Sequence, residues 1–313
     1  LMRLIFMGSP EFAVESLKLL NNSEHQILAV VTAPDRPTGR GRKVKPTAVK
    51  VAALKLGLPL LQPKNLKSKD FVNSLRELKP DLNVVVAFRI LPEVVFNLPP
   101  FGSVNLHASL LPQYRGAAPI NWALINGETR TGLTTFLLKR KVDAGDILLQ
   151  REVKIDAEDD FGSLHDKMAI EGAKLLLETV DSIDKNDLLP RPQETESATT
   201  APKLTPETGR INWNLPAEKI LNLIRGLSPV PGAYSFINGK KIIFLKAALF
   251  DKDVNVDAGS VIDSDPKKGF VIACGQRALE VLVLKPQAKK TMSSAEYVRG
   301  YNVKVGDRFY SEC

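Results

Sequence analysis

The chain has little cysteine and little histidine for its length. Cys274 and the terminal Cys313 are the only cysteines among 313 residues, too few for the disulfide framework of a small secreted domain. The three histidines, at positions 25, 107 and 165, lie far apart, and no Cys or His pair has the spacing of a zinc site. With no signal-like first segment, the sequence predicts a cytoplasmic protein that binds no metal.

Long hydrophobic runs are also missing. The longest apolar stretch covers residues 82–96, where a proline and charged side chains interrupt it, and a membrane-spanning helix needs about 20 predominantly apolar residues. We therefore expect no membrane segment. Hydrophobic residues make up 44% of the chain and charged residues 25%, a mixture typical of globular proteins that excludes collagen-like, coiled-coil and wholly disordered architectures.

The charge balance is basic. Forty-three Lys and Arg residues stand against 35 Asp and Glu residues, for a formal net charge of +8. A basic chain favours anionic partners such as nucleic acid or a phosphorylated substrate, although basicity alone is a weak signal.

Apolar runs alternate with helical patterns through the first part of the chain. Strands that alternate with helices imply a parallel sheet covered on both faces by right-handed crossovers. The sequence therefore predicts a Rossmann-like α/β domain. The expected strands are residues 3–7, 27–32, 82–87, 104–107, 131–138 and 147–153.

The turn after the first predicted strand has one glycine, Gly8, where a dinucleotide-binding fold has G-x-G-x-x-G. The next glycine pair, Gly39 and Gly41, follows the second strand among basic residues instead of opening a helix. We therefore expect no nicotinamide cofactor.

Composition changes after the long helix predicted at 161–185. Residues 189–206 are rich in proline and polar side chains, which is typical of a linker. Beyond them, short apolar runs recur about every ten residues between turn signals, a spacing typical of a small all-β barrel. We expect an α/β domain at 1–188, a linker at 189–206 and an OB-like barrel at 207–313.

Two polar side chains, Asn105 and His107, stand two residues apart in the predicted strand at 104–107. Because side chains alternate along a strand, both point to one face, at the sheet edge where α/β folds bind ligands. Asp143 lies in a polar turn between two later strands. If the fold carries Asp143 to His107, its carboxylate would fix the imidazole tautomer, as in acyl transfer. The alternative interpretations are that His107 is a structural histidine and that Asp143 is an exposed aspartate of a turn.

A basic loop follows the second predicted strand and has no apolar periodicity. We expect it to be mobile, either as a solvated surface loop or as a segment that contacts nucleic acid phosphates. Its candidate contact residues are Arg36, Arg40, Arg42, Lys43 and Lys45.

Five motifs spread over nearly the whole chain resemble those of the methionyl-tRNA formyltransferase family, a group of folate-dependent formyltransferases. The motifs are FMGSPEFA at 6–13, PDRPTGRGRKVKP at 34–46, NLHASLLPQYRGAAPINWALINGE at 105–128, VDAGDIL at 142–148 and LKPQAKKTM at 284–292. The central motif is highly specific for formyl transfer from folate, and the first and last motifs point to the tRNA enzymes.

The resemblance implies formyl transfer from 10-formyltetrahydrofolate to the α-amine of methionine on initiator Met-tRNA, for translation initiation. It implies no metal and no DNA partner. In this interpretation His107 accepts the proton of the amine, Asn105 donates to the oxyanion, and Asp143 orients and charges the imidazole. The expected folate-binding residues are Arg89, Ile90, Leu91, Ser109, Leu110, Leu111 and Pro112. To the five basic loop residues, the resemblance adds Lys289 and Lys290 as tRNA contacts.

Two segments depart from the family pattern. Phe88 and Arg89 stand where many relatives have Tyr and Gly, which places a long cation near the pterin pocket. Residues 139–141, Lys-Arg-Lys, stand where acidic or neutral residues are common.

Three other functions share part of this pattern. A sugar-nucleotide formyltransferase would have the same catalytic residues but no need of the basic loop. A hydrolase that deformylates folate would leave the second basic domain unexplained. A non-enzymatic RNA-binding protein would not need Asn105, His107 and Asp143 together.

Overall fold

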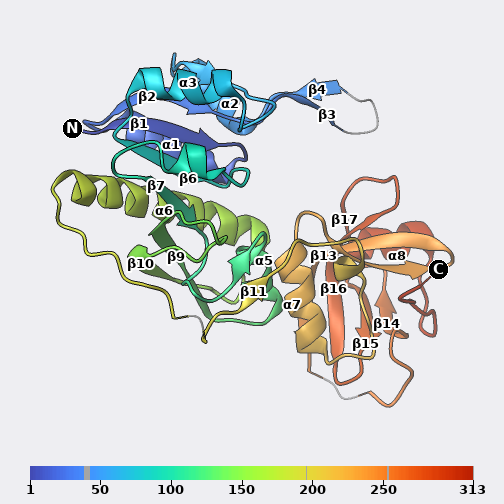
Figure 1. Ribbon diagram of the computed structural model, residues 1–313. Coiled ribbons are helices and arrows are strands. Elements are labelled where there is room, and N and C mark those ends of the chain that lie inside the picture. The colour runs from blue at the N-terminus through green and yellow to red at the C-terminus, as the bar shows by residue number, and fades with distance from the viewer. Residues whose placement is uncertain (39–42, 195, 252–253, 313) are drawn as a thin grey trace. The chain divides into compact units, whose positions relative to one another are not determined.

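The computed structural model describes residues 1–38, 43–194, 196–251 and 254–312 (Figure 1). The chain forms two compact units, each of which gathers more than one stretch of sequence. The first unit comprises residues 1–116, 130–154 and 165–201, and the second comprises 117–129, 155–164 and 202–313. The domain boundaries expected at 188 and 206 stay predictions.

A seven-stranded sheet forms the centre of the first unit. Its strands are β1 (Arg3–Gly8), β2 (Gln26–Val31), β5 (Leu60–Leu61), β6 (Leu82–Val86), β7 (Ser103–His107), β9 (Arg130–Leu137) and β10 (Ile147–Lys154). Their order is β10-β9-β7-β6-β1-β2-β5, and the five strands from β7 to β5 pair in parallel. β9 and β10 add an antiparallel edge. The predicted Rossmann-like sheet is confirmed, and the antiparallel edge is new.

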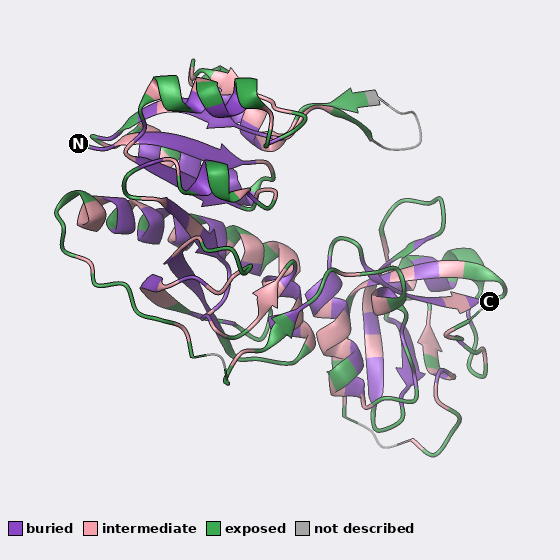
Figure 2. Ribbon diagram, in the orientation of Figure 1, coloured by how far each residue is buried: buried purple, intermediate pink, exposed green. Residues whose placement is uncertain are grey.

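Helices cover this sheet, and its central strands are buried (Figure 2). The helices are α1 (Phe12–Asn21), α2 (Ala48–Lys55), α3 (Lys69–Leu78), α4 (Glu93–Phe96) and α6 (Phe161–Asp184). The side chain of Thr47 caps α2 by accepting a hydrogen bond from the Lys50 amide, as N-cap threonines do. α3 buries Phe71, Val72 and Leu75 in the core that β1 and β6 share.

The contact between α6 and β7 sets the direction of the β7 side chains. Gly172 of α6 lies so close to β7 that an added Cβ would come within 2.8 Å of Leu106 Cδ2. Leu106 therefore faces α6 and is buried. Because strand side chains alternate, Asn105 and His107 point to the opposite face, as their spacing predicts.

The strand order reverses at β1, which pairs with β2 on one side and β6 on the other. Open parallel sheets bind ligands beyond the carboxyl ends of their strands at such a reversal. The segments that follow β1, β6 and β7 are therefore the expected place for a site.

The basic segment after β2 contains regular structure that the sequence did not predict. β3 (Arg36–Thr38) pairs antiparallel with β4 (Lys43–Lys45), with Arg36 opposite Lys45. The expectation of an irregular segment is wrong there, because three-residue strands are too short to show a period of two. Residues 39–42 lie outside the described residues.

An antiparallel sheet forms the second unit. Its strands are β12 (Ala233–Ile237), β13 (Lys240–Phe250), β14 (Val261–Asp265), β15 (Gly269–Ala273), β16 (Ala278–Pro286) and β17 (Met292–Ser293). The edge strand β12 pairs with the chain end at Phe236 and Tyr310, and the segment before β14 pairs with it at Ser260 and Arg308. One terminal segment thus joins both sheet edges, which is the closure of a barrel. The core includes Trp213, Phe244, Phe270 and Phe309.

The described part of the second unit also contains the α-helices α5 (Pro119–Ile125), α7 (Ala217–Leu227) and α8 (Ser294–Tyr301) and the 3-10 helix η1 (Glu207–Gly209). Helix α8 was not predicted from the sequence, although Ser293 and Glu296 form a capping box at its start. Asn121 of α5 donates a hydrogen bond to the Gly226 carbonyl of α7, 2.8 Å away. Among the helices that the structure describes, none is long and apolar enough to cross a membrane.

Candidate active site

The carboxyl end of β7 carries the two polar side chains singled out in the sequence. Asn105 is partly exposed and lines a cavity of about 110 Å³. His107, the last residue of β7, is 7% exposed. Asp143 lines the same cavity as Asn105. The fold therefore brings the three candidate catalytic residues together.

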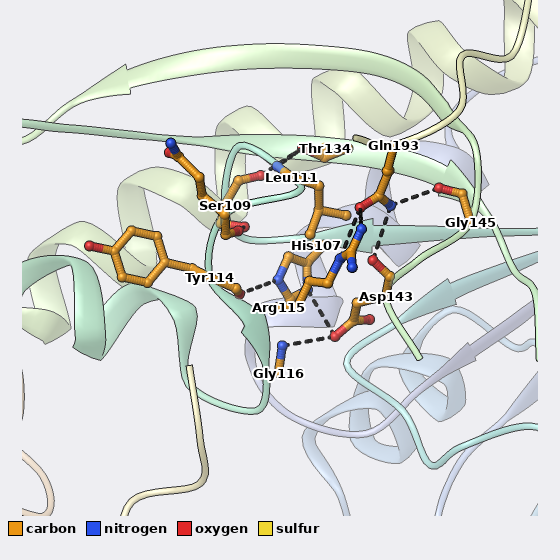
Figure 3. Close-up of polar contacts among 11 residues, drawn as sticks. His107, Ser109, Leu111, Tyr114, Arg115, Gly116, Thr134, Asp143, Gly145 and Gln193 are labelled. Atoms are coloured by element: carbon orange, nitrogen blue, oxygen red, sulfur yellow. Dashed lines mark hydrogen bonds and ion pairs between the residues drawn. The ribbon is translucent and has the colours of Figure 1, made fainter. Parts of the chain in front are cut away.

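His107 is held by a backbone carbonyl. Its Nε2 lies 2.9 Å from the carbonyl oxygen of Tyr114 (Figure 3). A carbonyl oxygen only accepts, so Nε2 carries a proton in this contact. Nδ1 faces Asp143 Oδ2 at 4.0 Å, too far for a direct hydrogen bond. A neutral imidazole in this position has its lone pair at Nδ1. The charge of a proton taken up at Nδ1 is stabilised by the nearby Asp143 carboxylate.

Asp143 lies in the turn between β9 and β10, where its φ is +50°. The Gly116 amide donates a hydrogen bond to Asp143 Oδ2 at 2.9 Å. The turn is tight, since a Cβ added to Gly145 would lie 1.6 Å from the Leu137 carbonyl oxygen. Glycine is required at position 145, and the turn fixes the carboxylate beside His107.

The expected folate residues Arg89, Ile90 and Leu91 line the cavity that contains Asn105 and Asp143. The Arg89 guanidinium donates to the Pro63 carbonyl oxygen at 2.8 Å and lies over the ring of Phe88. Burial lowers the pKa of Arg89, and the like charge of Arg36 lowers it further. The Arg89 guanidinium is thus held by the Pro63 carbonyl and lies near the like charge of Arg36.

Residues 109–112 form a closed loop after β7. Ser109 Oγ donates to the Gln113 carbonyl oxygen at 2.6 Å. Leu110 packs against Gly132 of β9, and Leu111 is buried against Phe136. These residues are not among those that line the 110 Å³ cavity. The leucine side chains of the loop pack into the protein.

Two side chains that were not predicted from the sequence, one on β9 and one on β10, anchor this loop. Thr134 Oγ1 donates to the Ser109 carbonyl oxygen at 2.7 Å and accepts from the Leu111 amide at 3.0 Å. Gln150 Nε2 donates to both Thr134 Oγ1 and the Leu111 carbonyl oxygen. A threonine within the predicted strand at 131–138 was the available sequence signal.

The described basic residues of the predicted tRNA set lie in two places. Arg36 and Lys45 line a second cavity of about 520 Å³, together with Arg89. The predicted contacts Arg40 and Arg42 lie outside the described residues, as does the side chain of Lys43. In the second unit, exposed Lys289 and Lys290 lie between β16 and β17.

The basic run at 139–141 has local partners. Lys139 pairs with Asp146 at 2.7 Å, and the exposed Arg140 side chain lies 4.0 Å from Glu93. Both basic residues line the 110 Å³ cavity.

Within the described ranges, no three His, Cys, Asp or Glu side chains are grouped to hold a metal ion.

Two family models match most of this chain. The family model for formyl transferase matches residues 2–180, and the model for the formyl transferase C-terminal domain matches residues 203–302. Methionyl-tRNA formyltransferase of Caldanaerobacter subterraneus is 47% identical over 307 residues, which cover 97% of this chain and 99% of that protein.

Two solved structures share the fold. WlaRD, a sugar 3N-formyl transferase crystallised with dTDP and 5-N-formyl-THF, has a TM-score of 0.67 at 18% identity, covering 92% of this chain and 99% of WlaRD. HypX from Aquifex aeolicus in complex with tetrahydrofolic acid has a TM-score of 0.65 at 19% identity. That match covers 98% of this chain and 48% of HypX, so the chain spans about half the HypX length. On the two family models and the 47% identity over nearly its full length, this chain belongs to the formyl transferase family.

Proposed function

We propose that this chain transfers the formyl group of 10-formyltetrahydrofolate to the α-amino group of methionine on initiator Met-tRNA. The observation that carries the proposal is the 47% identity, over nearly both full lengths, to a methionyl-tRNA formyltransferase. Asn105 and Asp143 line one cavity, and His107 Nδ1 lies 4.0 Å from the Asp143 carboxylate, which supports the proposal. The acceptor must be a neutral amine, because a protonated amine has no lone pair with which to attack the formyl carbon.

His107 is the base in this reaction. Its Nε2 proton is engaged with the Tyr114 carbonyl, so Nδ1 takes a proton from the amine as the new C–N bond forms. Asp143, 4.0 Å from Nδ1, stabilises the imidazolium. The same proton then passes to N10 of the folate as the old C–N10 bond breaks. A positioned base of this kind contributes about 10² to 10⁴ in rate.

Asn105 is the donor to the oxyanion of the tetrahedral intermediate. It shares a face of β7 with His107 and lines the cavity with Asp143. Removal of one oxyanion donor costs about 10² to 10³ in turnover. In this proposal the folate binds along Arg89, Ile90 and Leu91, which line the same cavity, and reaches the backbone of residues 109–112 outside that cavity.

The tRNA contacts are the basic residues on and around β3 and β4, with Lys289 and Lys290 in the second unit. Arg36 and Lys45 are exposed and follow the carboxyl end of β2, at the sheet edge where β7 ends. Phosphate contacts by such residues position the nucleic acid without reading its sequence. We place the reaction in the cytoplasm, where initiator tRNA is used.

A formyl-transfer assay with competing acceptors tests the proposal. The protein is incubated with 10-formyltetrahydrofolate labelled in the formyl group and with initiator Met-tRNA, elongator Met-tRNA or a nucleotide-linked amino sugar. We expect label on initiator Met-tRNA and none in the His107→Ala variant. Label on the amino sugar alone would favour a sugar-nucleotide formyltransferase, and label released only as formate would favour a hydrolase.

A further inference from the structure

Gln193 lies in the segment that the sequence predicts to be a linker, yet its side chain belongs to the site. Gln193 Oε1 accepts hydrogen bonds from Arg115 Nε at 3.0 Å and from Arg115 Nη2 at 2.6 Å. Gln193 Nε2 donates to the carbonyl oxygens of Asp143 at 3.0 Å and Gly145 at 2.7 Å. Figure 3 shows this amide between Arg115 and the Asp143 turn.

These four contacts use the whole hydrogen-bonding capacity of the amide, two donors and two acceptor lone pairs. They also fix its orientation. If the amide were flipped, its NH₂ group would face the donors of Arg115 and its oxygen would face two carbonyl oxygens. A side chain satisfied in this way, and partly buried, has one orientation.

The two segments that Gln193 joins hold His107 from both sides. One is β8 (Arg115–Gly116), which directly follows the Tyr114 carbonyl bound to His107 Nε2. The other is the turn of Asp143, whose carboxylate faces His107 Nδ1. The Gly116 amide contacts the Asp143 carboxylate directly. Gln193 adds a second link between these segments through Arg115 and the backbone of the turn.

The chain around Gln193 is anchored at both ends. Arg191 and Ile147 exchange two backbone hydrogen bonds of 2.8 Å. After Gln193, the Tyr114 amide donates to Thr199 Oγ1 and the Arg115 amide donates to the Thr199 carbonyl oxygen. β11 (Thr200–Ala201) then pairs in parallel with β8. The described residues on both sides of Gln193, Arg191 before it and Thr199 to Ala201 after it, are therefore hydrogen-bonded to the site.

We propose that Gln193 is a positioning residue for formyl transfer, which holds the Asp143 turn and the Tyr114–Gly116 segment at the spacing that His107 needs. The inference rests on the proposed function for its kinetic consequence. Gln193 itself acts through Asp143 and Arg115. A displacement of about 1 Å in a catalytic group can cost about 10²-fold in rate.

Two variants test this role. Gln193→Leu keeps the approximate size and removes all four hydrogen bonds. Gln193→Glu keeps the acceptor for Arg115 and replaces the two donations by a carboxylate that repels the Asp143 and Gly145 carbonyls. Gln276→Leu, at an exposed glutamine of the second unit, is the matched control. We expect both Gln193 variants to lower kcat about 10- to 100-fold with KM for Met-tRNA within about threefold.

Histidine NMR supplies a readout that does not need turnover. The chain has three histidines, and His25, which pairs with Asp181 at 2.8 Å, serves as an internal reference. We expect the ring signals of His107 to move in both Gln193 variants while those of His25 stay. This holds even if the formyl acceptor is not Met-tRNA, so a failure of the proposed function is distinguishable. Unmoved His107 signals, or a kcat equal to that of Gln276→Leu, would overturn the proposal.

Discussion

The Tyr114 carbonyl oxygen, 2.9 Å from His107 Nε2, determines which nitrogen of this histidine can act as a base. Tyr114 has a left-handed backbone with φ +57°, uncommon for a residue other than glycine. Because the carbonyl needs a donor, we predict that the neutral imidazole of His107 is the Nε2–H tautomer. ¹⁵N chemical shifts of the ring in labelled protein measure this directly. An Nδ1–H tautomer would mean that Asp143, rather than Tyr114, orients the ring.

The charge of Asp143 is expected to matter more than its shape. In Asp143→Asn the amide oxygen can still accept from the Gly116 amide, but it no longer stabilises a proton on His107 Nδ1. We expect kcat to fall by about 10² to 10⁴, the range of a general base that has lost its support. The thermal midpoint of unfolding should stay within a few degrees of the parent. Parent-like turnover would remove Asp143 from the mechanism.

Thr134 and Thr131 offer a matched pair on β9. The Thr134 hydroxyl bonds Ser109, Leu111 and Gln150, whereas the buried Thr131 hydroxyl has no hydrogen-bond partner among the described residues. Thr134→Val leaves buried polar groups unsatisfied, at about 1 to 3 kcal/mol, and frees the loop at 109–112. We expect lower stability and a higher KM for the folate.

Thr131→Val removes an unsatisfied hydroxyl from the same strand, so the free energy of unfolding should hold or rise. Urea unfolding measures the free energy of unfolding of both variants, and steady-state kinetics measures their KM for the folate. Equal effects of the two substitutions would show that the hydroxyl of Thr134 does not organise the folate loop.

The sequence predicted those parts of the site that depend on local periodicity. Asn105 and His107 share a face because β7 alternates and Leu106 packs on α6, a pattern visible in four residues. Asp143 could be named as a candidate, but its approach to His107 depends on how β9 and β10 return to the sheet.

The remaining contacts have no local signature. Tyr114 contributes a backbone carbonyl, which every residue has. Gln193 meets Arg115 across 78 positions of sequence, within a segment whose proline-rich composition is typical of a linker. A side chain that completes a hydrogen-bond network is visible only when the chain returns to the site.

Cys274 is expected to be inert in the folded protein. It is 5% exposed, and burial raises the pKa of its thiol to about 12, with the charge of Glu218 as a smaller cause. The thiolate is the reactive form. In a Cys313→Ser variant, which leaves Cys274 as the single thiol, an aromatic disulfide reagent at pH 8 should react only after unfolding. Rapid reaction under native conditions would contradict the burial.

The same shift predicts a loss of stability in alkali. The folded pKa is above the unfolded one, so the contribution of the neutral thiol is complete below about pH 9 and is lost as the pH rises toward 12. Tyr297, whose pKa burial also raises to about 12, adds to this trend. Cys274→Val isolates the cysteine part, and its free energy of unfolding should fall less steeply between pH 9 and 11.

The basic residues around β3 and β4 should govern the salt dependence of tRNA use. Arg36 and Lys45 lie opposite each other in the β3–β4 strand pair and are exposed. This placement is suited to phosphate contacts. Each lost phosphate contact lowers the slope of log affinity against log salt by about 0.7 to 0.9. We therefore expect Lys45→Ala to raise KM for Met-tRNA, to flatten its salt dependence by one contact and to leave KM for the folate unchanged.

Arg40, which lies outside the described residues, is predicted from its sequence position between two glycines to behave like Lys45. Lys18→Ala is the control, because Lys18 pairs with Glu15 at the end of α1, where that helix has returned toward the opposite edge of the sheet. Lys18→Ala removes the same charge from the chain and leaves the β3–β4 strand pair unchanged. If Lys18→Ala and Lys45→Ala flatten the salt dependence equally, the effect is caused by the net charge of the protein, and the β3–β4 strand pair does not contact the tRNA.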